Sequence, residues 1–185
     1  KVISIMKDDR DKLVVYLAWY TGSRLGECIS VRPKDIYKDK QSGVWVVSIK
    51  PDRTELEHIS KLDSSAKTEN ARRIVPIHKE LLRPLQQFKI EGKGWKRDTP
   101  NKYSKYFGRQ KLKIEDSVNP MGKQYSFHSI RHNVATNFQR AKVEESISAR
   151  LVGHSTVGAT MTYGYYSEGV EFKEALEAVN KLPVL

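Results

Sequence analysis

Two side chains of one predicted helix have the types and the spacing needed to hold a phosphate group. His128 and Arg131 stand three residues apart in the segment F-H-S-I-R-H-N-V-A-T, so on a helix they lie on the same face. An imidazole beside a guanidinium forms a set of donors suited to a tetrahedral oxyanion, and the nearby helix N-terminus also favours anions. The alternative is a histidine satisfied within the core beside a surface arginine.

Arg24 is the second candidate for binding an anion. It follows T-G-S at the start of another predicted helix, whose next residues include Leu25, Ile29 and Val31. A guanidinium on such an apolar segment needs an anionic partner. Glu27 can be that partner, and a structural ion pair between Arg24 and Glu27 is therefore the alternative to a phosphate site.

The last candidates on the chain are a histidine and a group of tyrosines. His154 follows Gly153 in L-V-G-H-S, a turn that ends a helix and presents the imidazole at the surface. Tyr163, Tyr165 and Tyr166 begin nine residues later. Packing against the core is the alternative role for these tyrosines.

These candidates require a scaffold, which the hydrophobic periodicity and the turn residues predict. Lys67 falls in a long connection between two strands, residues 50–71, where a solvated lysine is the alternative interpretation. The fold class expected is mainly helical with a small antiparallel β-sheet (α+β). Helices are expected over 8–20, 24–31, 78–90, 101–113, 128–141, 144–151 and 168–180, and strands over 44–49 and 72–77.

Charge is concentrated in the middle of the chain. The 185 residues carry a formal net charge of +11, and residues 61–142 alone hold 19 basic and 7 acidic side chains. A basic block within a folded domain is typical of proteins that bind polyanions such as nucleic acid. A solvated lysine-rich surface is the alternative.

Composition excludes several other classes. A hydrophobic content of 38% suits one folded domain rather than a disordered chain. No apolar run reaches the roughly 20 residues that span a bilayer, so we expect no membrane partner. The single cysteine, Cys28, excludes an internal disulfide and multi-cysteine zinc sites, and we expect no bound metal or other cofactor.

The order of these motifs resembles that of the tyrosine recombinase (phage integrase) family over almost the whole chain. The first arginine motif of the family is similar to T-G-S-R-L-G-E-C-I-S-V at 21–31, and its lysine hairpin to K-T-E-N-A-R-R-I-V-P-I at 67–77. Its H-x-x-R box is similar to F-H-S-I-R-H at 127–132, and its last segment to L-V-G-H-S at 151–155 followed by Tyr163. The resemblance implies the fold of a tyrosine recombinase catalytic domain.

The resemblance also implies a reaction, the exchange of DNA phosphodiesters without metal or ATP. Tyr163 would attack the scissile phosphate and form a 3′-phosphotyrosyl link, while Lys67 would protonate the departing 5′ oxygen. His128 would assist proton transfer from the tyrosine. Spacing favours Tyr163 as the nucleophile, and Tyr165 or Tyr166 is the second choice.

The other implied roles concern charge. Without a metal ion, the negative charge of the transferring phosphoryl group must be met by fixed donors. Arg24 and Arg131 supply two guanidinium groups, and His154 adds a hydrogen bond. Glu27 is expected to support Arg24.

The implied function is site-specific DNA recombination by a phage or mobile-element integrase. Its expected partners are double-stranded attachment-site DNA, other copies of itself in a homotetramer, and accessory DNA-bending proteins, in the nucleoid of a bacterial host cytoplasm. We expect residues 1–185 to form a single catalytic domain, monomeric when isolated, which lacks the N-terminal core-binding and arm-binding domains of its parent. A type IB topoisomerase and a non-catalytic DNA-binding module are the alternatives.

The C-terminal tail, residues 168–185, has apolar residues at helical spacing and glutamates on the remaining surface. A helix this short is stable only if its apolar side is buried. We expect it to dock on a neighbouring subunit in the assembled complex. In an isolated domain we expect it either to dock in cis, on its own chain, or to be disordered. The alternative is a closing helix of the domain's own core.

Overall fold

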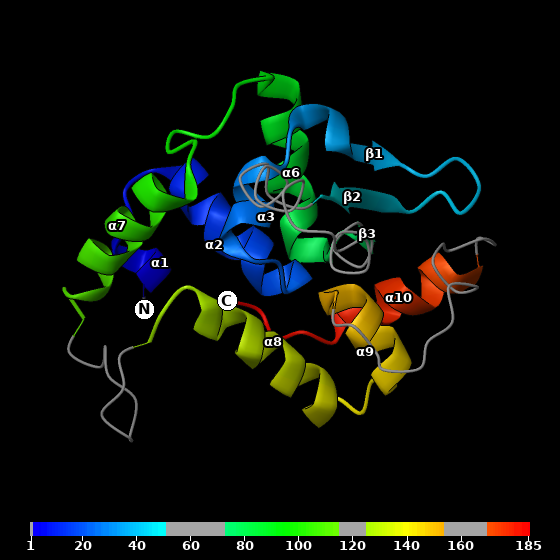
Figure 1. The fold of residues 1–185 in the computed structure, drawn as a ribbon. Coiled ribbons are helices and arrows are strands. Elements are labelled where there is room, and N and C mark those ends of the chain that lie inside the picture. The colour runs from blue at the N-terminus through cyan, green and yellow to red at the C-terminus, as the bar shows by residue number, and fades with distance from the viewer. Residues whose placement is uncertain (1, 51–72, 115–124, 154–169) are drawn as a thin grey trace, which may run out of the picture.

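The computed structural model describes residues 2–50, 73–114, 125–153 and 170–185. In these segments, helices surround a central helix, α2, and a small sheet lies to one side of it (Figure 1). In chain order the elements are α1 (Val2–Ile5), α2 (Asp9–Thr21), α3 (Leu25–Ser30), the 3₁₀ turn η1 (Pro33–Asp35), β1 (Ile36–Lys38), β2 (Trp45–Ile49), β3 (Arg73–Pro76), α6 (Lys79–Glu91), α7 (Pro100–Lys111), α8 (His128–Arg140), α9 (Glu145–Val152) and α10 (Val170–Asn180).

Helix α2 has a defined start and a defined end. The carboxylate of Asp8 caps its N-terminus by accepting hydrogen bonds from the backbone N–H groups of Arg10 and Asp11. Gly22 ends the helix in the left-handed conformation, with φ of 63°, and donates its N–H to the Ala18 carbonyl. Most of the helix is buried, and it packs against α3, α6 and α8, so the chain leaves α2 for the Arg24 motif at a fixed point in the core.

The sheet has three antiparallel strands in the order β1-β2-β3. Val47 of β2 stands opposite Ile36 of β1 on one side and Val75 of β3 on the other. The inward face of the sheet, including these three side chains, joins the main core. The opposite face carries Val46 and Ile74 and is covered by α10.

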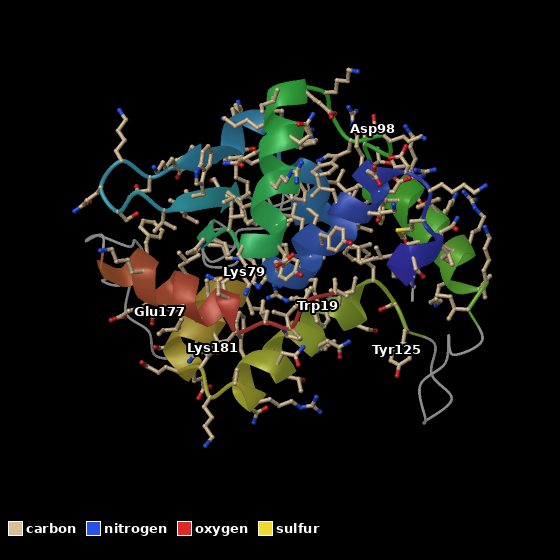
Figure 2. All side chains as sticks on the ribbon, turned by 180° about the vertical axis from the view of Figure 1, so that it is seen from behind. Trp19, Lys79, Asp98, Tyr125, Glu177 and Lys181 are labelled. Atoms are coloured by element: carbon tan, nitrogen blue, oxygen red, sulfur yellow. The ribbon has the colours of Figure 1, made fainter. Side chains whose placement is uncertain are left out.

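Helix α10 docks on its own chain in this structure. Phe172 packs against the outer face of the sheet, and Val179 is fully buried in the main core. The side-chain oxygen of Asn180 accepts a hydrogen bond from the backbone N–H of Lys79, where α6 begins beside α10 (Figure 2). Trp19 donates its indole N–H to the Pro183 carbonyl. The tail therefore docks in cis and contributes to the core, which is expected both for an isolated domain and for the alternative of a closing core helix, while docking in trans remains a prediction.

The predicted fold class is confirmed. Each predicted helix is present with ends shifted by at most two residues, and both predicted strands pair in the sheet. The short helix α1 and the strand β1 were not predicted. The connection 50–71 lies outside the described residues from position 51 onward. None of the helices in the described segments combines the length and the hydropathy that crossing a bilayer requires.

Candidate active site

Arg24 and Glu27 form the ion pair that was the structural alternative for this motif. Arg24 is the residue before α3, and its backbone N–H donates to Oε2 of Glu27 over 2.8 Å. Its Nη1 donates to Oε1 of the same carboxylate over 3.1 Å. The Glu27 side chain is only 2% exposed whereas that of Arg24 is 43% exposed. The pair therefore anchors a guanidinium that still faces solvent.

A second arginine, Arg73 at the start of β3, shares this carboxylate. Its Nη2 donates to Oε2 of Glu27 over 3.0 Å and to Oγ of Ser23 over 2.9 Å, and its Nε donates to the Leu151 carbonyl over 2.9 Å. Sequence reasoning included Arg73 within the lysine-hairpin motif without giving it a role. The available signal was a charged side chain on a strand whose neighbours, Ile74 and Val75, are apolar.

The buried carboxylate of Glu27 stays ionised at neutral pH. Burial alone raises the pKa of a carboxyl group, but the charge and hydrogen bond of Arg73 and the contacts from Arg24 outweigh it. The pKa of Glu27 is therefore below its ordinary value. Within α3, the thiol of Cys28 is completely buried, and burial raises its pKa well above the ordinary value.

Arg131 and His128 share the first turn of α8 but occupy opposite environments. Arg131 is buried, and its Nη1 donates to the carbonyls of Gly22, over 2.7 Å, and Val152. Its Nη2 donates to the Gly153 carbonyl over 3.1 Å. His128 is exposed. The alternative of a core histidine beside a surface arginine is therefore wrong, because the arginine is the residue that the core holds.

The charge of Arg131 survives its burial. Burial and, to a smaller extent, the positive charges of Arg24 and Arg73 together lower the pKa of Arg131 to about 10, against the opposing effect of Glu27. The group therefore remains protonated at neutral pH. A guanidinium has five N–H donors. Within the described part of the chain, Arg131 uses three of them on backbone carbonyls, so Nε–H and one Nη2–H remain available to a ligand.

The pKa of His128 is below its ordinary value. Although the residue is exposed overall, partial removal of its ring from water contributes most to the lowering, followed by the charges of His132, Arg131 and Arg24. His132 lies one turn further along α8, and its ring meets that of His128 edge-on with 4.8 Å between centroids. Sequence reasoning did not single out His132, although a histidine four residues on lies on the same helix face. His128 is therefore neutral at pH 7 and able to accept a proton.

Four predicted site residues, Arg24, Glu27, His128 and Arg131, lie close enough for their charges to affect one another's pKa values. The guanidinium groups outnumber the single buried carboxylate, so the cluster favours a bound anion. A phosphate diester meets this requirement, because its oxygens accept hydrogen bonds from arginine and histidine. The other predicted site residues lie outside the described residues: Lys67, His154, Tyr163, Tyr165 and Tyr166.

Comparisons with known proteins point to one family. A sequence model described as "Phage integrase family" matches residues 2–168. A probable integrase/recombinase protein of Methanocaldococcus jannaschii is 26% identical over 186 aligned positions, which cover 94% of this chain and 50% of that protein.

Two solved structures share the fold. The integrase of mycobacterium phage Brujita superposes with a TM-score of 0.64 at 13% identity, covering 98% of this chain and 54% of that one. A XerH site-specific recombinase, bound to a palindromic difH substrate in a post-cleavage complex, gives a TM-score of 0.50 at 16% identity over 84% of this chain and 43% of that one. The chain thus spans about half the length of the relatives that it matches.

Proposed function

Because the chain belongs to the phage integrase family, we propose that it performs site-specific DNA recombination through a 3′-phosphotyrosyl intermediate. The observation that carries the proposal is the half-exposed guanidinium of Arg24, held on the buried carboxylate of Glu27 close to Arg131 and His128. This arrangement supplies a concentrated positive charge without a metal ion. The matches support neither a type IB topoisomerase nor a non-catalytic DNA-binding module.

In this proposal the arginines stabilise the charge that develops on the scissile phosphate. The non-bridging oxygens become more negative as the phosphoryl group is transferred, and donors fixed beforehand meet that charge without reorganising. Arg24 contacts one of these oxygens from the exposed side of its guanidinium. Arg131 contributes its Nε–H and its remaining Nη2–H, and His154 adds a further donor.

Proton transfer falls to three other residues. His128, neutral at pH 7, accepts the phenolic proton as Tyr163 attacks phosphorus, and the 3′-phosphotyrosyl bond forms as the bond to the 5′ oxygen breaks. Lys67 gives its proton to that leaving oxygen. The phosphotyrosyl ester retains the energy of the backbone bond, so rejoining needs neither ATP nor a metal ion.

The proposed partners follow from the reaction. Its substrate is double-stranded DNA carrying attachment sites, and exchange between two such sites requires four copies of the chain. Accessory DNA-bending proteins assist the assembly, and the reaction takes place on DNA in the cytoplasm of a bacterial host. The basic central region supplies the electrostatic attraction to DNA.

Trapping the covalent intermediate tests the proposal. The natural protein is incubated with a nicked suicide substrate built from the genomic flanks of its own gene, in the presence of EDTA. We expect a protein–DNA adduct with the natural protein and none with Tyr163→Phe, which keeps the ring and removes only the attacking oxygen. Tyr165→Phe and Tyr166→Phe are the matched controls and retain the adduct. A strict requirement for Mg²⁺, or loss of the adduct in a control only, contradicts the mechanism.

A further inference from the structure

Arg73 is a buried cation to which the proposed reaction gives no role. Its side chain is 5% exposed, and its Nη2 forms an ion pair with Oε2 of Glu27 at 3.0 Å. Removing a guanidinium from water is costly, and well-packed apolar residues often stabilise a fold as well as a buried ion pair does. The burial of this ion pair is therefore weak evidence that Arg73 serves only to stabilise the fold. The hydrogen bonds of Arg73 indicate a further role.

That geometry fixes the orientation of one carboxylate. Oε2 of Glu27 accepts from Nη2 of Arg73 and from the backbone N–H of Arg24, over 3.0 and 2.8 Å. With Oε2 held by two donors, Oε1 is directed at Nη1 of Arg24, 3.1 Å away. A half-exposed arginine otherwise has many rotamers to lose when it is fixed. Arg73 thus limits the conformations of the Arg24 side chain by fixing the carboxylate to which that side chain bonds.

The same guanidinium also reaches the end of α9. Its Nε donates to the Leu151 carbonyl, while Arg131 takes the next two carbonyls, those of Val152 and Gly153. Two arginines therefore satisfy the C-terminal carbonyls of α9, where the helix dipole favours positive charge. Through Arg73 and Ser23, the start of α3 and the end of α9 are held on one rigid planar group.

We propose that Arg73 is a positioning residue: by anchoring Glu27, it directs the guanidinium of Arg24 toward the scissile phosphate before DNA binds. The inference rests on the proposed function for the identity of the phosphate. Arg73 acts through Glu27 and does not itself contact DNA.

The first test needs no DNA. Nitrogen-15 relaxation at Nε of Arg24 is measured in the 185-residue chain for the wild type, Arg73→Met and the control Arg97→Met. Arg97 pairs with the buried carboxylate of Asp11, so the control removes a comparable ion pair elsewhere. We expect Arg24 to become mobile in Arg73→Met only. Unchanged relaxation of Arg24 in Arg73→Met overturns the proposal.

A second variant covers the case in which Arg73→Met does not fold. Arg73→Lys keeps the charge but cannot bond Glu27, Ser23 and Leu151 through one planar fork. Circular dichroism shows which variant is folded, and the same relaxation criterion then applies to Arg73→Lys. Ordered Arg24 in a folded Arg73→Lys, with the lysine shown by crystallography to have left Glu27, overturns the proposal equally.

The second test is a double-mutant cycle on the rate of adduct formation at saturating protein. We expect Arg73→Met to reduce this rate by about 10²-fold, with DNA affinity changed by less than about threefold. In an Arg24→Ala background, Arg73→Met should cause no further loss, because its effect passes through Arg24. Multiplication of the two single effects contradicts the proposal. If the wild type forms no adduct, the proposed function fails, while the relaxation measurement still decides the role of Arg73.

Discussion

The guanidinium of Arg73 lies against the backbone of Gly153, so closely that a Cβ atom at position 153 would be 2.8 Å from Nη1. Gly153 also has φ of +74°, in the left-handed region. Both features require glycine at the residue that ends α9 and precedes His154.

Replacing Gly153 with alanine should therefore destabilise the chain by two effects. The left-handed conformation costs an alanine about 1–2 kcal/mol, and the contact with Arg73 adds about 1–3 kcal/mol. Gly92→Ala is the matched control, because Gly92 has φ of +64° and nothing within 4 Å of the added Cβ. Urea unfolding measures both variants. Equal losses in the two would show that Arg73 moves aside without cost.

Glu27→Gln should be strongly destabilising, because it leaves the buried Arg73 without its counter-charge. Breaking a buried ion pair by removing one partner costs about 3–5 kcal/mol. Asp98→Asn removes the carboxylate of an exposed pair with Lys102, whose side chains are both 64% exposed, and should have no measurable effect. Denaturant unfolding at pH 7 provides the comparison. A small loss in Glu27→Gln would mean that water replaces the carboxylate.

The difference in stability between the wild type and Glu27→Gln should depend on pH. The pKa of Glu27 is lower in the folded than in the unfolded chain, so the unfolded chain binds more protons at acidic pH. The stability that Glu27 contributes is complete above its ordinary pKa and is lost as pH falls through the lowered value. The difference in unfolding free energy between wild type and Glu27→Gln should shrink over that range. A constant difference contradicts the ion pair.

His128 should titrate below the ordinary pKa of a histidine, and the neighbouring charge of His132 is one cause. Proton NMR of the imidazole resonances measures the pKa of His128 in the wild type and in the variants. His132→Ala should raise the pKa of His128, since a like charge 4.8 Å away between ring centroids is removed. Asn133→Ala, a change at the adjacent exposed position, should leave the titration unchanged. A pKa of His128 that does not respond to His132→Ala would show that desolvation and the charges of Arg131 and Arg24 cause the shift without His132.

Lys67 has a role that only its place in the motif predicts. If it is the general acid, a substrate with sulfur in place of the leaving 5′ oxygen should restore adduct formation to Lys67→Ala, because a thiolate leaves without a proton. Gel analysis of the adduct measures this rescue. Rescue of Lys61→Ala instead would transfer the role to Lys61.

Local patterns predicted most of the fold but not its long-range contacts. Asp8 and Gly22 bracket α2 by capping interactions that depend on neighbouring residues, and such a helix is readable from the sequence. Strand β1 has three residues, too few to show a period of two.

The candidate site shows the same division. The Arg24–Glu27 pair spans three positions and could be predicted, whereas the Arg73–Glu27 pair spans 46. The burial of Arg131 depends on carbonyls at Gly22 and Val152, which only the packing of α2, α8 and α9 brings together.

The complete burial of Cys28 makes the only cysteine of the sequence a reporter of how often the site opens. A thiol reagent cannot reach Sγ while α3 is seated, and the raised pKa leaves almost no thiolate to react. Labelling must then wait for α3 to detach, and where reclosing is faster than labelling the rate reports the free energy of that opening. The rate of Cys28 labelling, followed with a chromogenic thiol reagent, can thus rank variants near Arg24 by their free energy of opening before any attachment sequence is found.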